Sequence, residues 1–338
     1  MKEQSEQTPS ITLEDVARLA GVSGMTVSRV LQDHVNVSEQ TRAKVQAAVA
    51  ALGYVPNRLA GALTTAKTRL IAVIVPSLSN IVFPEVLRGA NECLEAAGYQ
   101  AVIGVSDYDL EKEERIIAAM RAWRPSGWIL AGLEHTPRAL QMLREVRSPV
   151  VEVMDSDGEP IDMAVGFSNT QAGRDTGQFL ADTGRRRVGY VGGDLCRDLR
   201  AAKRRKGFEQ ALAENGLELE ASFTAQQASS FLLGRAGLAQ LLERHPDLDA
   251  VYFSNDDMAV GGLMHCMGAG VKVPGRLALA GFNGLEIGEA VPQRLTTIRS
   301  PRYRIGQLAA EHILARLAGN APPLRLDLGY EFITGQTT

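Results

Sequence analysis

Short polar and cationic side chains gather near the N-terminus of the chain. Thr26, Ser28 and Arg29 lie within a few residues of Gly24 and Met25. Hydroxyl and guanidinium groups can donate hydrogen bonds to phosphate oxygens and to base edges, so this segment has the chemistry of a nucleic-acid contact. A small helical subdomain with solvated polar residues would have the same composition, so the segment alone does not separate the two interpretations.

The surrounding sequence predicts the helices that would position these side chains. Thr12 can cap a first helix, because Asp15 stands where a capping-box acid reaches back. Ser23 can cap a second helix after a turn at Gly21, where a glycine can take a positive φ. A third helix is expected to begin after Ser38 and to stop at Gly53. Two short helices joined in this way predict a helix-turn-helix, whose second helix enters the major groove of DNA.

The charge is distributed unevenly along the chain. The whole chain has a formal net charge of −3. Residues 10–70 carry seven Lys or Arg and four Asp or Glu, and seven minus four gives +3. A mildly basic head on an acidic body is typical of a protein that presents one end to phosphates.

Beyond residue 69, apolar strands alternate with amphipathic helices. Uninterrupted apolar strands between such helices predict parallel sheets that are covered on both faces. Two sets of strands predict two doubly wound halves, with a ligand cleft beyond the carboxyl ends of the strands. We therefore expect an α/β body behind the all-α head. The predicted strands are Leu70–Val75, Ala101–Val105, Trp128–Ala131, Val150–Met154, Val188–Val191, Ala250–Phe253 and Leu277–Gly281.

The signatures of several other functional classes are missing from the sequence. There is no P-loop, no GxGxxG after a strand and no GxSxG elbow, so we do not expect an enzyme. The five histidines are scattered and the three cysteines are far apart, so we expect neither a metal nor a cofactor. Residues 1–10 are polar and no apolar stretch could span a bilayer, so we expect a cytoplasmic protein without a membrane partner.

The head resembles that of LacI/GalR-family repressors, and the resemblance covers the whole chain. It is carried by Thr12-Leu13-Glu14-Asp15-Val16-Ala17, Ala20-Gly21-Val22-Ser23, Thr26-Val27-Ser28-Arg29-Val30-Leu31, Val37-Ser38, Thr41-Arg42, Leu52-Gly53-Tyr54-Val55-Pro56-Asn57 and Leu63. The resemblance implies a homodimer that represses transcription by occupying a palindromic operator in double-stranded DNA. It also implies a helix-turn-helix domain at 1–56, a hinge helix or linker at 57–68 and an effector-binding and dimerisation domain at 69–338.

The family pattern also implies which residues meet DNA. Two hinge helices enter the minor groove together, and the leucine that matches Leu63 wedges into a base step. Gly24 and Met25 depart from the larger polar residues found at these positions in another family member, and Met25 can make only apolar contacts with bases. The implied contacts are Thr12, Ser23, Gly24, Met25, Thr26, Ser28, Arg29, Asn36, Ser38, Thr41, Tyr54, Asn57, Arg58, Ala60 and Leu63.

The body resembles the two-lobed periplasmic sugar-binding fold that these regulators share. In the family the chain crosses three times between the lobes, and the resemblance places these crossings near Phe167, Ser300 and Leu328. The implied lobes are residues 69–167 with 300–327, and residues 168–299 with 328–338. The implied effector contacts in the cleft between them are Phe83, His135, Asp155, Arg204, Asn255 and Asn283.

Two of these residues indicate the class of effector. Arg204 would offer a fork of donors to a carboxylate or to two hydroxyls. Asn283 stands where another family member has an aspartate, which removes a negative charge from the cleft. The segments around Asp155 and His135 resemble the gluconate-repressor branch of the family. We therefore expect release from the operator by a sugar acid such as gluconate or a keto-gluconate.

Less specific interpretations of these residues stay open. Asn255 can simply cap the next helix, Phe83 can pack in the core, and His135 can be incidental. A regulator of the same family that responds to a neutral sugar, a purine or a protein co-regulator is the alternative function.

Overall fold

The structure of the chain is a computed structural model, and it describes residues 11–31, 37–54 and 68–338. The chain divides into two compact units, Met1–Thr68 and Arg69–Thr338. None of the helices in the described ranges has the length and apolar character needed to cross a membrane.

The first unit contains the three helices that the sequence predicts. They are α1 (Leu13–Ala20), α2 (Gly24–Leu31) and α3 (Glu39–Leu52). Gly21 ends α1 with a φ of 66°, a left-handed conformation that favours glycine. One apolar face of each helix supplies the small core, which contains Val16, Ala17, Val27, Val30, Val45 and Ala48.

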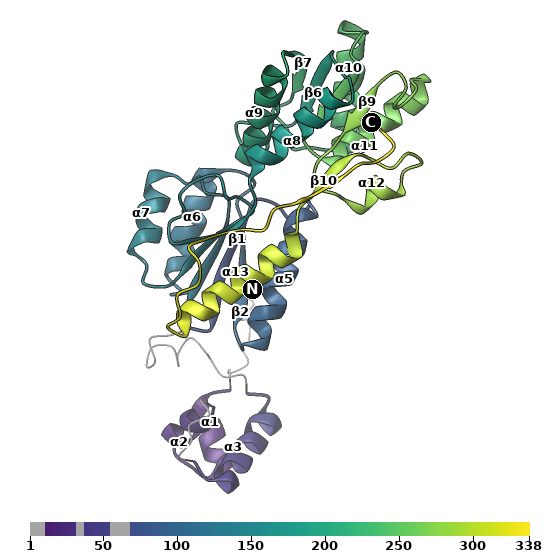
Figure 1. Cartoon of the computed structure of the whole chain (residues 1–338). Coiled ribbons are helices and arrows are strands. Elements are labelled where there is room, and N and C mark those ends of the chain that lie inside the picture. The colour runs from purple at the N-terminus through teal and green to yellow at the C-terminus, as the bar shows by residue number, and fades with distance from the viewer. Residues whose placement is uncertain (1–10, 32–36, 55–67) are drawn as a thin grey trace, which may run out of the picture. The chain divides into compact units, whose positions relative to one another are not determined.

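The second unit contains two parallel sheets, each of which forms the centre of a lobe (Figure 1). Lobe 1 has the strand order β11-β5-β4-β3-β1-β2, and every neighbouring pair in it is parallel. Its strands are β1 (Leu70–Val75), β2 (Gln100–Val105), β3 (Gly127–Ala131), β4 (Val150–Val153), β5 (Met163–Gly166) and β11 (Arg325–Asp327). Its helices are α5 (Val82–Ala96), α6 (Leu110–Arg121), α7 (Pro137–Glu145) and α13 (Arg302–Leu317).

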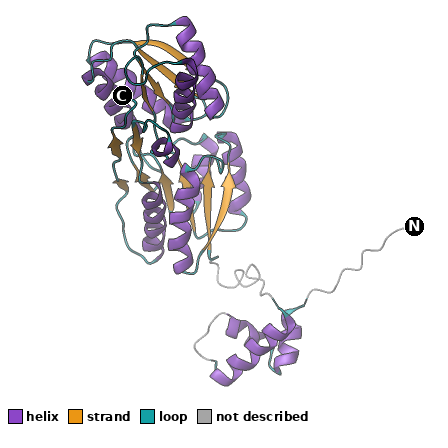
Figure 2. Ribbon diagram, turned by 90° about the vertical axis from the view of Figure 1, so that its right-hand side faces the viewer, coloured by secondary structure: helices purple, strands orange, loops and turns teal. Residues whose placement is uncertain are grey.

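Lobe 2 has the parallel strand order β7-β6-β8-β9. Its strands are β6 (Val188–Gly192), β7 (Leu219–Thr224), β8 (Ala250–Phe253) and β9 (Ala278–Ala280), with the antiparallel pair β10 (Thr297–Arg299) and β12 (Glu331–Ile333) alongside. Its helices are α8 (Asn169–Asp182), α9 (Leu199–Glu214), α10 (Phe231–Arg244), α11 (Asp256–Ala269) and α12 (Glu286–Ala290). In both lobes helices flank the sheet on either side, which is the α/β architecture expected from the apolar strands (Figure 2).

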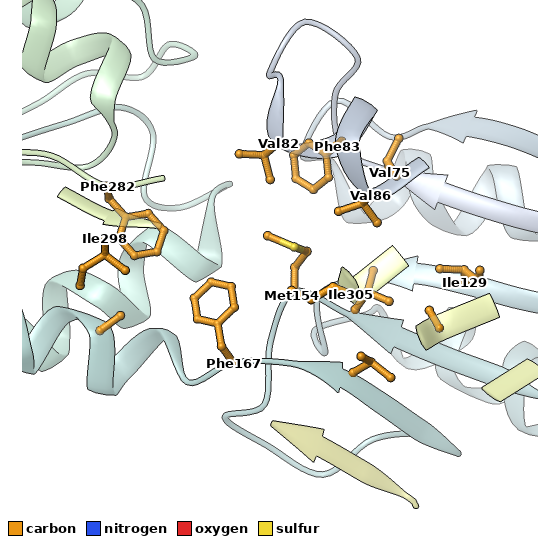
Figure 3. Packing of buried hydrophobic residues seen from close by; sticks show 14 of the residues in the cluster. Val75, Val82, Phe83, Val86, Ile129, Met154, Phe167, Phe282, Ile298 and Ile305 are labelled. Atoms are coloured by element: carbon orange, nitrogen blue, oxygen red, sulfur yellow. The ribbon is translucent and has the colours of Figure 1, made fainter. Parts of the chain in front are cut away.

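The chain crosses between the lobes three times: after β5, between β10 and α13, and between β11 and β12. Aromatic side chains pack where these segments meet. The rings of Phe167 and Phe282 lie 6.1 Å apart, and Figure 3 shows Phe167 between Phe282 and Met154. One buried apolar cluster therefore continues from lobe 1 into lobe 2.

Helix α9 begins at Leu199, directly after Asp198. The carboxylate of Asp198 accepts a hydrogen bond from the Ala201 backbone N–H at 3.1 Å and caps the helix. The first turns of α9 carry Arg200 and Lys203 towards lobe 1, whereas Arg204 contacts residues of lobe 2.

Helices α8 and α9 pack through two glycines. A Cβ atom at Gly207 would lie 2.0 Å from the carbonyl oxygen of Thr170. A Cβ atom at Gly173 would lie 1.8 Å from the carbonyl oxygen of Arg204. Both positions therefore need a residue without a side chain, and the close contact fixes α9 relative to the rest of lobe 2.

We predict that Gly207→Ala lowers the free energy of unfolding by about 1–3 kcal/mol, because the methyl group must push α9 away from α8. Gly268→Ala is the matched control, since a Cβ atom at this helical glycine meets nothing within 4 Å. The control should raise stability by about 0.5–1 kcal/mol, as is usual for alanine in a helix. Urea unfolding followed by circular dichroism measures both, and equal stability of the two variants would contradict this packing argument.

Candidate functional site

The start of α2 lies on the surface of the first unit. The Ser23 hydroxyl accepts a hydrogen bond from the Thr26 backbone N–H at 3.2 Å and lies 2.9 Å from the Thr26 hydroxyl. Val27 faces the core, whereas Met25 is 67% exposed and Arg29 is also exposed. Helix α2 therefore presents a cationic and partly apolar outer face that is free to meet a ligand.

Two other residues of the predicted DNA-contacting set stand beside this surface. A Cβ atom at Gly24 would lie 3.1 Å from Cδ2 of Leu13, so a larger residue at this position would press on α1. Ser28 is half-buried on α2 and lies one residue before Arg29. Because Cδ2 is the end of a flexible side chain, this contact limits the size of the residue at the start of α2 only slightly.

Four of the predicted DNA contacts have structural roles in the unit. The Thr12 hydroxyl accepts a hydrogen bond from the Asp15 backbone N–H at 3.3 Å, and the Asp15 carboxylate accepts one from the Thr12 N–H at 3.0 Å. Hydrogen bonds from Thr12 lower the pKa of Asp15. Ser38 caps α3 by accepting a hydrogen bond from the Thr41 N–H at 3.3 Å. Tyr54 packs, partly buried, against the core of the unit.

The remaining predicted contacts fall outside the described residues. They are Asn36, Asn57, Arg58, Ala60 and Leu63, together with residues 57–67 of the predicted hinge.

In the second unit, a cavity of about 330 Å³ opens between the lobes. We call it the interlobe cavity. Loops that follow β1, β2, β6, β7 and β8 line it, so its walls come from the carboxyl ends of strands in both lobes. Polar residues dominate these loops, and they include Ser77, Ser79, Asn80, Asp107, Tyr108, Asp194, Arg197, Asp198, Gln226, Gln227, Ser229, Ser254 and Asp257.

The interlobe cavity is acidic. Four aspartates and one arginine line it, which gives a formal charge of −3. The aspartates are Asp107, Asp194, Asp198 and Asp257, and the arginine is Arg197. Carboxylates accept hydrogen bonds from hydroxyl groups, so this wall suits a polyhydroxylated ligand. The sequence-based expectation of fewer negative charges in the cleft considered Asn283 alone and did not include these four residues.

Three of the six predicted effector residues support the wall of the interlobe cavity from behind. Arg204 donates a hydrogen bond to the Ser254 carbonyl oxygen at 3.3 Å. The Asn255 side chain donates to the Ser229 hydroxyl at 2.6 Å and also accepts from the Met258 N–H at 3.1 Å, which caps α11. Phe83 is buried, with its ring centroid 6.3 Å from that of Tyr108. Ser254, Ser229 and Tyr108 are themselves part of the wall.

Arg204 is a buried cation without a carboxylate partner among the described residues. Its side chain donates to the Asn169 amide oxygen at 2.9 Å and lies 4.0 Å above the Phe282 ring. Its Nε has no acceptor within the part of the chain that the structure describes. Burying a charge without a counter-ion is costly, so the hydrogen bonds of Arg204 and the aromatic face of Phe282 must stabilise the guanidinium.

Two further predicted effector residues interact with other groups of the protein. The Asp155 carboxylate is fully buried and accepts a hydrogen bond from the Lys203 ammonium at 2.6 Å. Burial raises the pKa of Asp155, while Lys203 opposes this rise. Asn283 is buried, has a φ of 116°, and its carbonyl oxygen accepts a hydrogen bond from Arg302.

His135 lies inside lobe 1 and does not line the interlobe cavity. Its Nδ1 is 2.5 Å from Glu113, and its Nε2 is 3.1 Å from Glu152. Burial disfavours the charged ring, but hydrogen bonds to the two glutamates outweigh it and raise the pKa of His135 to about 9. Both ring nitrogens are thus engaged, which leaves no free nitrogen for the predicted contact with an effector.

We predict that His135 makes the stability of the protein depend on pH in the alkaline range. Because folding raises the pKa of His135 to about 9, its contribution is complete below pH ~6.5 and is lost as the pH rises through the folded value. The free energy of unfolding should fall by about 2 kcal/mol between roughly pH 7.5 and 9. Urea unfolding across this range measures the slope.

His135→Gln should remove most of this slope, whereas His265→Gln, at a half-buried position on α11, should keep it. If His135→Gln retained the pH dependence of the unsubstituted protein, the assignment of the slope to His135 would be wrong.

None of the six predicted effector residues is among those that line the interlobe cavity, although the sequence carried a signal for its wall. Asp107 and Tyr108 follow β2, and Asp194 and Asp198 follow β6. The rule that ligands bind beyond the carboxyl ends of parallel strands indicates all four positions. They lay outside the short family pattern that guided the prediction.

Comparison with known proteins gives matches along the whole chain. Residues 12–57 match the family described as bacterial regulatory proteins, lacI family. Residues 68–325 match the family described as periplasmic binding proteins and sugar binding domain of LacI family. The HTH-type transcriptional regulator GntR of Escherichia coli strain K12 is 41% identical over 324 residues, which cover 96% of this chain and 97% of that protein.

Solved structures agree with these matches. A LacI-family transcriptional regulator from Silicibacter pomeroyi superposes with a TM-score of 0.93 at 47% identity, over 97% of this chain and 99% of the other. The lac repressor dimer bound to operator and the anti-inducer ONPF superposes with a TM-score of 0.85 at 26% identity, over 97% of this chain and 99% of the other.

Proposed function

Because the chain belongs to the LacI family of bacterial transcriptional regulators, we propose that it binds a palindromic operator as a homodimer and leaves it when a sugar acid enters the interlobe cavity. Gluconate or a keto-gluconate is the effector class that we propose. The protein would act in the cytoplasm, where its operator DNA lies.

The surface of α2 supports the proposed operator contact. Arg29 and Met25 are exposed on one helix, and Ser23 and Thr26 carry hydroxyls at its start. Arginine and hydroxyl donors bind phosphates and bases, and a methionine can contact a thymine methyl group. The operator contacts of Asn57, Arg58, Ala60 and Leu63 are part of the same proposal and rest on the family resemblance.

The buried and unpaired guanidinium of Arg204 is the observation that carries the choice of a sugar acid. Arg204 lies directly behind Ser254 in the cavity wall, and no carboxylate among the described residues neutralises it. The four aspartates of the cavity offer acceptors to hydroxyl groups. A ligand with a carboxylate at one end and hydroxyls along its length fits both features.

A neutral sugar is the second candidate effector, and one observation favours it. The formal charge of −3 on the cavity wall repels an anion, whereas neutral hydroxyls meet no such cost. The two candidates differ in whether the ligand carries a carboxylate towards Arg204.

An apolar surface supports the proposed homodimer. Met264 and Met267 on α11 are 51% and 54% exposed, and Ile81 at the start of α5 is 49% exposed. Met264 lies two helical turns after Asp257, and Asp257 and Asn80 line one cavity. Burial of these exposed apolar side chains against a second copy would remove them from water.

Arg204→Ala should bind the operator like the unsubstituted protein but need at least about tenfold more gluconate for release, because charge-assisted hydrogen bonds to the ligand are lost. Fluorescence anisotropy of a labelled operator, selected from random DNA, measures binding and release.

Arg29→Ala is the complementary control, since it changes the first unit alone. It should weaken operator binding while gluconate still raises its melting temperature. If Arg204→Ala left the operator at the same gluconate concentration as the unsubstituted protein, the assignment of Arg204 to effector binding would be overturned. Loss of both activities in Arg29→Ala would mean that the two units do not act separately.

A further inference from the structure

Three cationic side chains of lobe 2 reach across to lobe 1. Arg197, Arg200 and Lys203 are spaced three residues apart, just before and within the first turns of α9. Their partners lie at or just after the ends of three lobe 1 strands that follow one another in the chain: β2, β3 and β4. This row of contacts runs along the carboxyl edge of the lobe 1 sheet.

Lys203 makes the closest contacts of the row. Its ammonium lies 2.6 Å from the carboxylate of Asp155, after β4, and 2.5 Å from that of Glu134, after β3. The Asp155 side chain is 0% exposed, and that of Lys203 is only 21% exposed. A pair shielded in this way is stronger than a surface ion pair, because water screens it less.

The two arginines extend the row with weaker contacts. Arg200 donates a hydrogen bond to the carbonyl oxygen of Ala131, at the end of β3, at 3.2 Å. Its guanidinium also lies 5.5 Å from the ring centroid of Phe83 in lobe 1. Arg197 lies 3.7 Å from the carboxylate of Asp109, which caps α6.

Within the described ranges, the Asp155 carboxylate has only one other hydrogen-bond donor, whereas the Lys203 ammonium has a second carboxylate partner, Glu134. Burial raises the pKa of Asp155, and hydrogen bonds from Lys203 and from the Asp157 N–H oppose this rise. Without Lys203, the carboxylate would be a buried charge with only one remaining hydrogen bond, which is strongly unfavourable. Separation of the lobes would break this pair, so the pair opposes separation.

We propose that Lys203 is a positioning residue that latches lobe 2 to lobe 1 through Asp155 and Glu134, with Arg200 and Arg197 beside it, before any effector is bound. The latch holds the strand ends of the two lobes together around the interlobe cavity. This inference deepens the proposed function, since a latched body reaches the effector-binding arrangement with less movement. The latch itself requires neither the operator nor the effector.

Hydrogen exchange of the full-length protein, without DNA or ligand, tests the latch. In Lys203→Met, backbone amides of 131–136, 154–158 and 197–203 should exchange at least about tenfold faster, because both faces of the contact become accessible to water. Lys203→Arg, which keeps the charge, should restore most of the protection. Lys206→Met is the matched control, since Lys206 is exposed on the same helix.

Two results would overturn the latch. One is unchanged exchange in Lys203→Met. The other is an equal rise in the exchange rates of amides in β1 and β8, within the lobe cores, which would mean that Lys203 stabilises the whole fold and not the contact between the lobes. The proposed effector can fail separately, because exchange is measured without it and the gluconate response is measured with Arg204→Ala.

Discussion

The tight packing of α8 on α9 is the constraint on which the cleft depends. Gly173 and Gly207 let the two backbones approach so closely that neither position has room for a Cβ atom. Helix α9 is consequently fixed in lobe 2 with Lys203 and Arg204 on adjacent positions. One of these cations reaches across to lobe 1, and the other stays inside lobe 2 behind the cavity wall. A small displacement of α9 would therefore disturb both the junction of the lobes and the ligand site.

Buried charge explains why these neighbouring cations have different roles. Lys203 is neutralised by two carboxylates, so its interactions are satisfied without a ligand. Arg204 has an amide, a carbonyl group and an aromatic face but no carboxylate among the described residues, so it can gain from binding an anion. The aspartates of the interlobe cavity add acceptors for hydroxyl groups. The wall of the interlobe cavity is thus acidic, and the cation of Arg204 lies behind it.

Much of the fold could be predicted from the sequence, because its signals are local. The Thr12 capping box, the left-handed Gly21 and the apolar strands β1, β3 and β8 each depend on a few adjacent residues. Strands β5, β7, β10, β11 and β12 were not predicted, and for β10, β11 and β12 the pairing of only three residues is decided by distant parts of the chain. The site was harder to predict, because its contacts also join residues that are far apart in the chain. The partners of His135 are 22 and 17 residues away, and Lys203 meets Asp155 at a separation of 48 residues, so no local pattern indicates either contact.

Calorimetric titration of the full-length protein with gluconate, and separately with glucose as a neutral sugar of similar size, tests the central claim most directly. The account predicts saturable binding of gluconate and little or no binding of glucose. In a separate unfolding experiment, gluconate at one hundred times its dissociation constant should raise the free energy of unfolding by about 2.7 kcal/mol. Binding of glucose without binding of gluconate would contradict it, because the unpaired charge of Arg204 would then have no part in selecting the effector.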